Sequence, residues 1–86
     1  FETAEQEKAL LDYVAGGKGF IPLHCASACF TGSKDYIALV GGQFRSHTTG
    51  TFRPQVVADH PVTKGFSSFA SWDETYVHTK HNEQHR

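Results

Sequence analysis

Two glycine pairs, Gly16–Gly17 and Gly41–Gly42, constrain the fold more than any other feature of this sequence. Glycine readily adopts the left-handed backbone conformation with which many helices end. Each pair follows a segment whose apolar residues recur at helical spacing. The sequence therefore predicts two short helices, one within residues 3–19 and one within residues 33–44.

The predicted starts of both helices carry residues that suit an N-cap. Thr3 is followed three residues later by Gln6, which is the spacing of a capping box. Ser33 is predicted to cap the second helix. The predicted buried faces are apolar and consist of Leu10, Leu11 and Val14 in the first helix and Tyr36, Ile37 and Val40 in the second.

Three further segments are predicted to be strands, namely 19–24, 52–59 and 70–78. The first is a short apolar run bounded by glycine, which is typical of a buried strand in a parallel sheet, although Pro22 lacks a backbone donor. The last alternates in residue type, so one of its faces would carry Trp72, Glu74, Tyr76 and His78. A polar turn is predicted for 46–53 and a loop for 59–66.

This order of elements predicts an α/β fold in which two helices accompany a small parallel sheet. A parallel sheet needs helices on both faces, and two helices cannot supply that cover. Residues 1–86 are therefore expected to be part of a larger α/β domain, with elements missing at both ends. The absence of methionine leads to the same expectation, and the remainder of the longer chain would be a partner.

Charge and hydropathy exclude some classes of function. The net charge of −1 gives no electrostatic reason to expect nucleic acid or an anionic membrane as a partner. No apolar run approaches the roughly 20 residues that span a bilayer, and no signal peptide is visible. Two cysteines are too few to indicate a redox compartment, so the localisation is not predicted.

The stretch "PLHCASACF", residues 22–30, concentrates chemically active side chains after the first predicted strand. Its cysteines are one residue too far apart for a c-type haem site, and Phe30 follows Cys29. Cys25 at a strand end could be an activated thiol, because ligands bind at the carboxyl ends of strands in open α/β sheets. The alternative, which we favour, is that both cysteines are small buried packing residues.

Histidines and one acid supply the other candidates. Glu74 lies between Trp72 and Tyr76 on one predicted strand face, where an acid can act in proton transfer and aromatic rings suit sugars. Imidazole and carboxylate also suit a divalent metal ion. We predict no cofactor and no metal site, and if an ion does bind, its candidate ligands are His24, His47 and His78.

Four blocks of sequence, "GKGFIPLHCASACF", "ALVGGQFRSH", "DHPVTKGF" and "SWDETYVHTKHN", occur in this order and spacing in ThuA-like domains. The chain thus resembles the trehalose-utilisation family, above all versions in large multidomain proteins of planctomycete-type bacteria. The resemblance covers essentially all 86 residues. It implies a flavodoxin-like parallel sheet related to class I glutamine amidotransferases, so that residues 1–86 would be a partial ThuA-like domain.

The resemblance also implies which residues carry function. In the related amidotransferases a catalytic cysteine occupies a strand-to-helix elbow, where this chain has His24, with Cys25 one residue later. Many ThuA-like domains have alanine at the Cys25 position, so the family does not support a thiol nucleophile. The polar positions that the family shares fall on His24, Ser27, His47, His60, Asp73 and Glu74.

Three functions follow as hypotheses. The first is an enzyme that processes a small-molecule sugar, with His24 and Glu74 as the acid/base pair. In this hypothesis the substrate-binding residues are Ser27, His47, Asp73, Trp72 and Tyr76. The second is a sugar-binding module without chemistry, and the third is a thiol hydrolase of amidotransferase type that uses Cys25.

Overall fold

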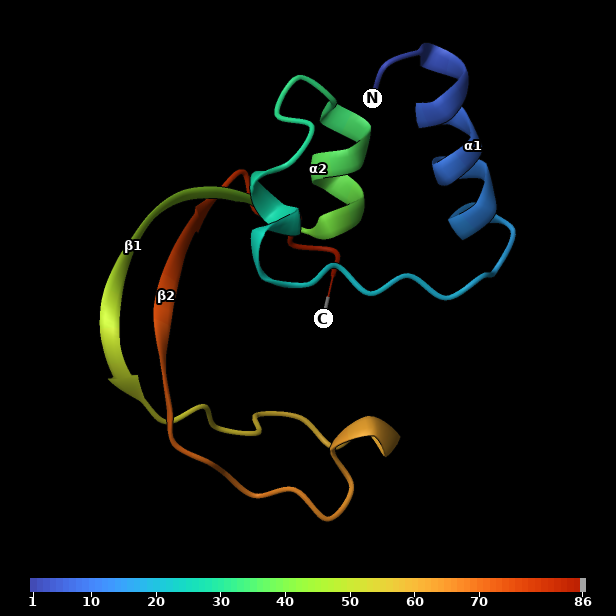
Figure 1. Ribbon diagram of the computed structural model, residues 1–86. Coiled ribbons are helices and arrows are strands. Elements are labelled where there is room, and N and C mark those ends of the chain that lie inside the picture. The colour runs from blue at the N-terminus through green and yellow to red at the C-terminus, as the bar shows by residue number, and fades with distance from the viewer. Residues whose placement is uncertain (86) are drawn as a thin grey trace. The chain divides into compact units, whose positions relative to one another are not determined.

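The computed structural model describes residues 1–85, which form two compact units. Unit 1 comprises residues 1–46 and the segment from Val77 onward, and unit 2 comprises residues 47–76. Along the chain the elements are α1 (Ala4–Ala15), the 3-10 helix η1 (His24–Ala28), α2 (Lys34–Val40), β1 (Gln43–Phe52), the 3-10 helix η2 (Pro61–Thr63) and β2 (Ser71–Thr79) (Figure 1). No helix within residues 1–85 is long and apolar enough to cross a membrane.

Helix α1 forms as its end signals predict. The Thr3 side chain accepts a hydrogen bond from the Gln6 backbone N–H, and the Gln6 side-chain oxygen accepts one from the Thr3 backbone N–H, which completes the capping box. The helix ends at Ala15, and Gly17 then takes φ +86°, where a β-carbon would be strained. The predicted apolar stripe is half-buried, and the rest of the helix is largely exposed.

Helix α2 is likewise confirmed. The Ser33 hydroxyl oxygen accepts a hydrogen bond from the Tyr36 backbone N–H at 3.1 Å, as an N-cap should. Gly41 closes the helix at φ +97°. Ser33 also donates its hydroxyl hydrogen to the Glu7 carboxylate, which ties the start of α2 to α1. Figure 1 shows the two helices packed beside each other.

The core of unit 1 is centred on Tyr36 and Ile37, which are 4% and 5% exposed. The ring of Phe30 packs edge-on against Tyr36 at 4.8 Å between centroids and stacks on Phe1 at 3.8 Å. The Tyr36 hydroxyl donates a hydrogen bond of 2.8 Å to the Ala26 carbonyl of η1. Burial raises the pKa of Tyr36, and the nearby thiols of Cys29 and Cys25 raise it further.

The sheet consists of β1 and β2, which run antiparallel (Figure 1). The predicted strand at 70–78 is confirmed by β2, but the polar turn predicted for 46–53 is wrong because most of that segment belongs to β1. Its threonines are β-branched and favour a strand once a partner is present. A polar composition alone could not reveal that partner, which comes much later in the chain.

Two predicted strands do not form. Segment 19–24 is irregular, and its apolar side chains Ile21 and Leu23 are 81% and 74% exposed instead of buried. Pro22 removes a ladder donor there, and no strand among residues 1–85 pairs with this segment. Segment 52–59 contains Pro54 and makes only an isolated antiparallel bridge between Gln55 and Ser68. The loop predicted for 59–66 is confirmed, apart from the short turn η2.

The α/β class is confirmed, and the parallel arrangement is not seen in the described residues. The predicted parallel sheet required a strand at 19–24, and that segment is irregular in the structure. The strands that do form pair antiparallel. The flavodoxin-like sheet, and with it the expected missing elements, therefore stays a prediction.

Candidate functional site

Unit 2 brings an imidazole, a carboxylate and a phenol ring together on its sheet. His47 of β1 and Glu74 of β2 approach to 3.6 Å between Nε2 and Oε1, and their side chains are 39% and 40% exposed. The His47 and Tyr76 rings lie 6.2 Å apart between centroids at an angle of 34°. Strand alternation places Glu74 and Tyr76 on the same face of β2. We call His47, Glu74 and Tyr76 the imidazole–carboxylate face.

The neighbouring predicted residues divide between the two faces of β2. Trp72 precedes Glu74 by two positions, so it shares the face, and it is 72% exposed. Asp73 has the opposite parity, and its Oδ1 accepts a hydrogen bond of 2.7 Å from the Glu74 backbone N–H. Trp72 is therefore placed to extend the imidazole–carboxylate face, whereas the predicted sugar-binding role of Asp73 gains no support from its position.

Unit 1 pairs two other candidate residues. Ser27, 7% exposed in η1, lies 3.0 Å from His78, measured between Ser27 Oγ and His78 Nε2. The Ser27 hydroxyl also donates to the His24 carbonyl at 3.4 Å. The His78 carbonyl oxygen accepts a hydrogen bond of 3.1 Å from the His81 imidazole. This contact joins η1 to the end of β2 and buries the serine.

His24 occupies a different kind of position from the one predicted. It begins η1 after an irregular segment, with φ +43°, and does not follow a strand. A left-handed backbone at a residue with a β-carbon costs about 1 kcal/mol or more. His24 belongs to unit 1 and Glu74 to unit 2, so their predicted acid/base pairing stays a prediction.

The cysteines correct another expectation. Cys25 and Cys29 were expected to be buried packing residues, and both are exposed. The reason is that η1 turns Ser27 inward, so the cysteines on either side of it face outward. Cys29 contributes a weak hydrogen bond of 3.5 Å from its thiol to the Cys25 carbonyl. Exposure is compatible with the thiol hydrolase hypothesis, which is not tested by the geometry.

His60 has a structural role that its family position did not reveal. Its Nδ1 accepts a hydrogen bond of 3.1 Å from the Val62 backbone N–H, so the imidazole caps η2. The position of a histidine directly before proline could have suggested this cap.

Concerning metals, residues 1–85 contain no group of three or more histidine, cysteine, aspartate or glutamate side chains that could hold one metal ion.

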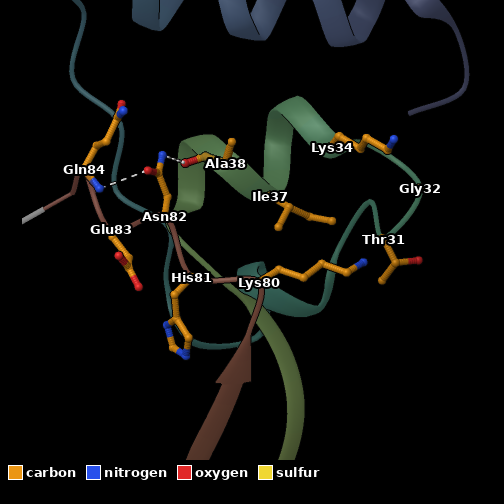
Figure 2. Close-up of a pocket in the computed structure, with 10 residues that line it drawn as sticks. All are labelled: Thr31, Gly32, Lys34, Ile37, Ala38, Lys80, His81, Asn82, Glu83 and Gln84. Atoms are coloured by element: carbon orange, nitrogen blue, oxygen red, sulfur yellow. Dashed lines mark hydrogen bonds between the residues drawn. The ribbon is translucent and has the colours of Figure 1, made fainter.

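A pocket in unit 1 involves residues that sequence reasoning did not select. It has a volume of about 810 Å³, and two lysines, Lys34 and Lys80, line it together with the turn after β2 (Figure 2). No motif links these lysines, because Lys34 begins α2 and Lys80 follows β2. Only the fold brings them to one pocket.

The elements and the site define an α/β chain with an accessible imidazole–carboxylate pair beside the Tyr76 ring. The model of the ThuA family, described as trehalose utilisation, matches residues 1–86. The chain therefore belongs to the ThuA family, and the match indicates a role in trehalose utilisation. Comparisons with curated proteins and with solved structures gave no match.

Proposed function

We propose that the chain binds a small-molecule sugar on the imidazole–carboxylate face and processes it by acid/base chemistry. The family match supports a carbohydrate role. The observation that carries the proposal is the 3.6 Å approach of His47 to Glu74 with both side chains about two-fifths exposed. Such a pair is accessible to a ligand, and imidazole and carboxylate are side chains that commonly serve in general acid–base catalysis.

The aromatic residues of the face supply the binding part of the proposal. A sugar ring has one face of C–H bonds, which packs on an aromatic ring, while its hydroxyls hydrogen-bond to carboxylate and imidazole. Tyr76 lies beside His47, and Trp72 continues the same strand face with most of its surface exposed. The two rings would hold the sugar while Glu74 and His47 contact its hydroxyls.

In the chemical step, Glu74 would accept a proton from a water molecule as the water oxygen bonds to the anomeric carbon, and a protonated His47 would donate a proton to the glycosidic oxygen as the old C–O bond breaks. General acid–base catalysis of this kind contributes about 10²–10⁴-fold to a rate. The sequence predicted His24 as the partner of Glu74. Distances within unit 2 favour His47, and the role of His24 is retained as a prediction for the same chemistry.

The test is incubation of the protein with trehalose and other simple disaccharides, followed by chromatographic analysis of the products. Glu74→Gln should lower turnover by about 10²-fold or more because it removes the carboxylate but keeps the size of the side chain. Asp59→Asn is the matched control, since it neutralises an exposed carboxylate of the same unit. Equal activity of the Glu74→Gln variant and the wild type would contradict the proposal.

The second candidate function, a sugar-binding module without chemistry, uses the same aromatic residues. It is favoured if the protein binds a disaccharide, if Tyr76→Ala and Trp72→Ala weaken that binding, and if no product forms. The thiol hydrolase alternative is separated by alkylation of Cys25, which is exposed and therefore accessible to iodoacetamide. Loss of activity on alkylation would favour that alternative over the acid/base proposal.

A further inference from the structure

The pocket of unit 1 is a second place where a ligand can be held. It is lined by residues of three segments: the turn before α2, α2 itself, and the turn that follows β2 (Figure 2). Its volume of about 810 Å³ falls within the range of about 300–1,000 Å³ that is usual for small-molecule sites. All these residues belong to unit 1, and none of them contributes to the imidazole–carboxylate face.

One side of this pocket is cationic. Lys34 and Lys80 both line it, and Glu83 is the only acid among the lining residues that the structure describes. Among residues 1–85, neither lysine forms an ion pair with a carboxylate. Figure 2 shows the Lys80 side chain extending toward Thr31, which lines the same pocket. Lysine and threonine side chains are hydrogen-bond donors that suit a phosphate group.

The opposite side of the pocket is held in place by hydrogen bonds. The Asn82 side chain donates to the Ala38 carbonyl of α2 at 3.0 Å and accepts from the Gln84 backbone N–H at 3.2 Å. The Asn82 backbone N–H bonds to the Gly41 carbonyl at 2.9 Å. These contacts fix the turn after β2 against the end of α2, so the pocket wall is largely pre-formed.

The backbone of Lys80 is a further sign of a built site. It has φ +52°, a left-handed conformation that costs about 1 kcal/mol or more for a residue with a β-carbon. A glycine or asparagine would adopt that conformation at lower cost. Lysine there places an ammonium group in the pocket lining at the expense of local stability.

From these observations we propose that the pocket of unit 1 binds a phosphorylated sugar. The phosphate group would be held by Lys34, Lys80 and Thr31, and the neutral hydroxyl-bearing ring would lie toward the polar side chains of the turn after β2. The volume exceeds what a phosphate alone occupies, which leaves room for the ring. The proposal does not rest on the imidazole–carboxylate face.

The test is a titration of the ¹⁵N-labelled chain, followed by amide chemical shifts, with glucose 6-phosphate, inorganic phosphate and glucose as separate probes. Glucose 6-phosphate should shift the amides of Gly32, Lys34 and Lys80 with saturation, and phosphate should do so more weakly. Glucose alone should leave these amides unchanged. Equal affinity for inorganic phosphate and for glucose 6-phosphate would overturn the sugar part of the proposal.

Variants separate a specific site from general attraction. Lys34→Gln and Lys80→Gln should each weaken binding of glucose 6-phosphate about tenfold, the usual size of a lost charge-assisted hydrogen bond. Lys80→Arg should retain binding within a few fold. Lys18→Gln removes an exposed charge of the same unit outside the pocket and should change affinity less than twofold. An equal loss with Lys18→Gln would overturn the proposal.

Discussion

Unit 1 and unit 2 are stabilised in different ways. The buried side chains of residues 1–85 lie in unit 1: Tyr36, which packs against Phe30, Ile37, and the hydrogen-bonded Ser27 and Ser33. None of residues 47–76 is buried, and unit 2 exposes Val57, Trp72 and Phe66 by more than half of their surface. The comparison indicates that side-chain packing stabilises unit 1, while unit 2 depends on the backbone ladder of its strands.

The difference matches the two kinds of site. A face that binds a ligand must stay accessible, and the imidazole–carboxylate face lies in the unit without a core. The proposed phosphorylated-sugar pocket lies instead in unit 1, which has the buried core, and hydrogen bonds fix one of its walls. Changes in the core should therefore alter stability more than sugar binding by the imidazole–carboxylate face, and changes on that face should do the reverse.

The largest expected effect is on the core of unit 1. Ile37→Ala should lower the free energy of unfolding by about 2–4 kcal/mol, because it leaves a cavity at a site that is 5% exposed. Val57→Ala is the matched control in unit 2, where the side chain is 92% exposed, and it should change stability by less than about 0.5 kcal/mol. Urea unfolding followed by circular dichroism measures both variants. Similar losses of unfolding free energy in the two would contradict the difference between unit 1 and unit 2.

A smaller effect is expected from serine hydroxyls. Ser33→Ala should cost about 1–2 kcal/mol because it removes both the N-cap of α2 and the hydrogen bond to Glu7. Ser68→Ala in unit 2 removes an exposed hydrogen bond of 3.0 Å to the Pro54 carbonyl. It should cost only about a few tenths of a kcal/mol, because exposed hydrogen bonds contribute little to stability. Thermal melting of the two variants compares them directly. A larger loss for Ser68→Ala would show that unit 2 is the more strongly held.

The third expected effect on stability concerns the Tyr36 hydroxyl. Tyr36→Phe should cost about 1 kcal/mol through loss of the hydrogen bond to Ala26. Because the pKa of Tyr36 is raised in the folded state, the unfolded chain loses this proton first as pH rises. The contribution of the Tyr36 hydroxyl to the free energy of unfolding is thus complete below the ordinary tyrosine pKa of about 10. It disappears as pH rises through the higher pKa that Tyr36 has in the folded state.

The measurement is the free energy of unfolding between neutral pH and the alkaline range, for the wild type and for Tyr36→Phe. The wild type should lose more stability in the alkaline range than the variant does. Tyr13→Phe is the control, since Tyr13 is 55% exposed, and it should follow the wild type. Parallel pH profiles for the wild type and Tyr36→Phe would show that this hydroxyl is not the group responsible.

Local signals predicted the helices, and long-range pairing limited the prediction of strands. Thr3, Ser33 and Gly41 act on backbone groups a few residues away, so the sequence around each helix contains what its ends require. A strand needs a partner that may be distant in sequence. Segment 19–24 has a strand's composition without a partner, whereas the polar threonines of β1 have one in β2.

The candidate site shows the same division. His47, Glu74 and Tyr76 were selected by residue type and family position, and the structure brings these three together. Ser27 and His78 were also named, but their direct contact across the chain could not be read from spacing. Lys34 and Lys80 were missed because only the packing of the turn after β2 against α2 makes them neighbours of one pocket.

Sugar binding by the imidazole–carboxylate face is the central claim, and mapping the binding site of trehalose by amide chemical shifts tests it most directly. Titration of the ¹⁵N-labelled chain with trehalose should shift the amides of His47, Glu74 and Tyr76 with saturation, and Tyr76→Ala should weaken that response. The amides of the buried residues Tyr36 and Ile37 should stay in place. Saturable shifts confined to unit 1, or no shifts at all, would contradict the account.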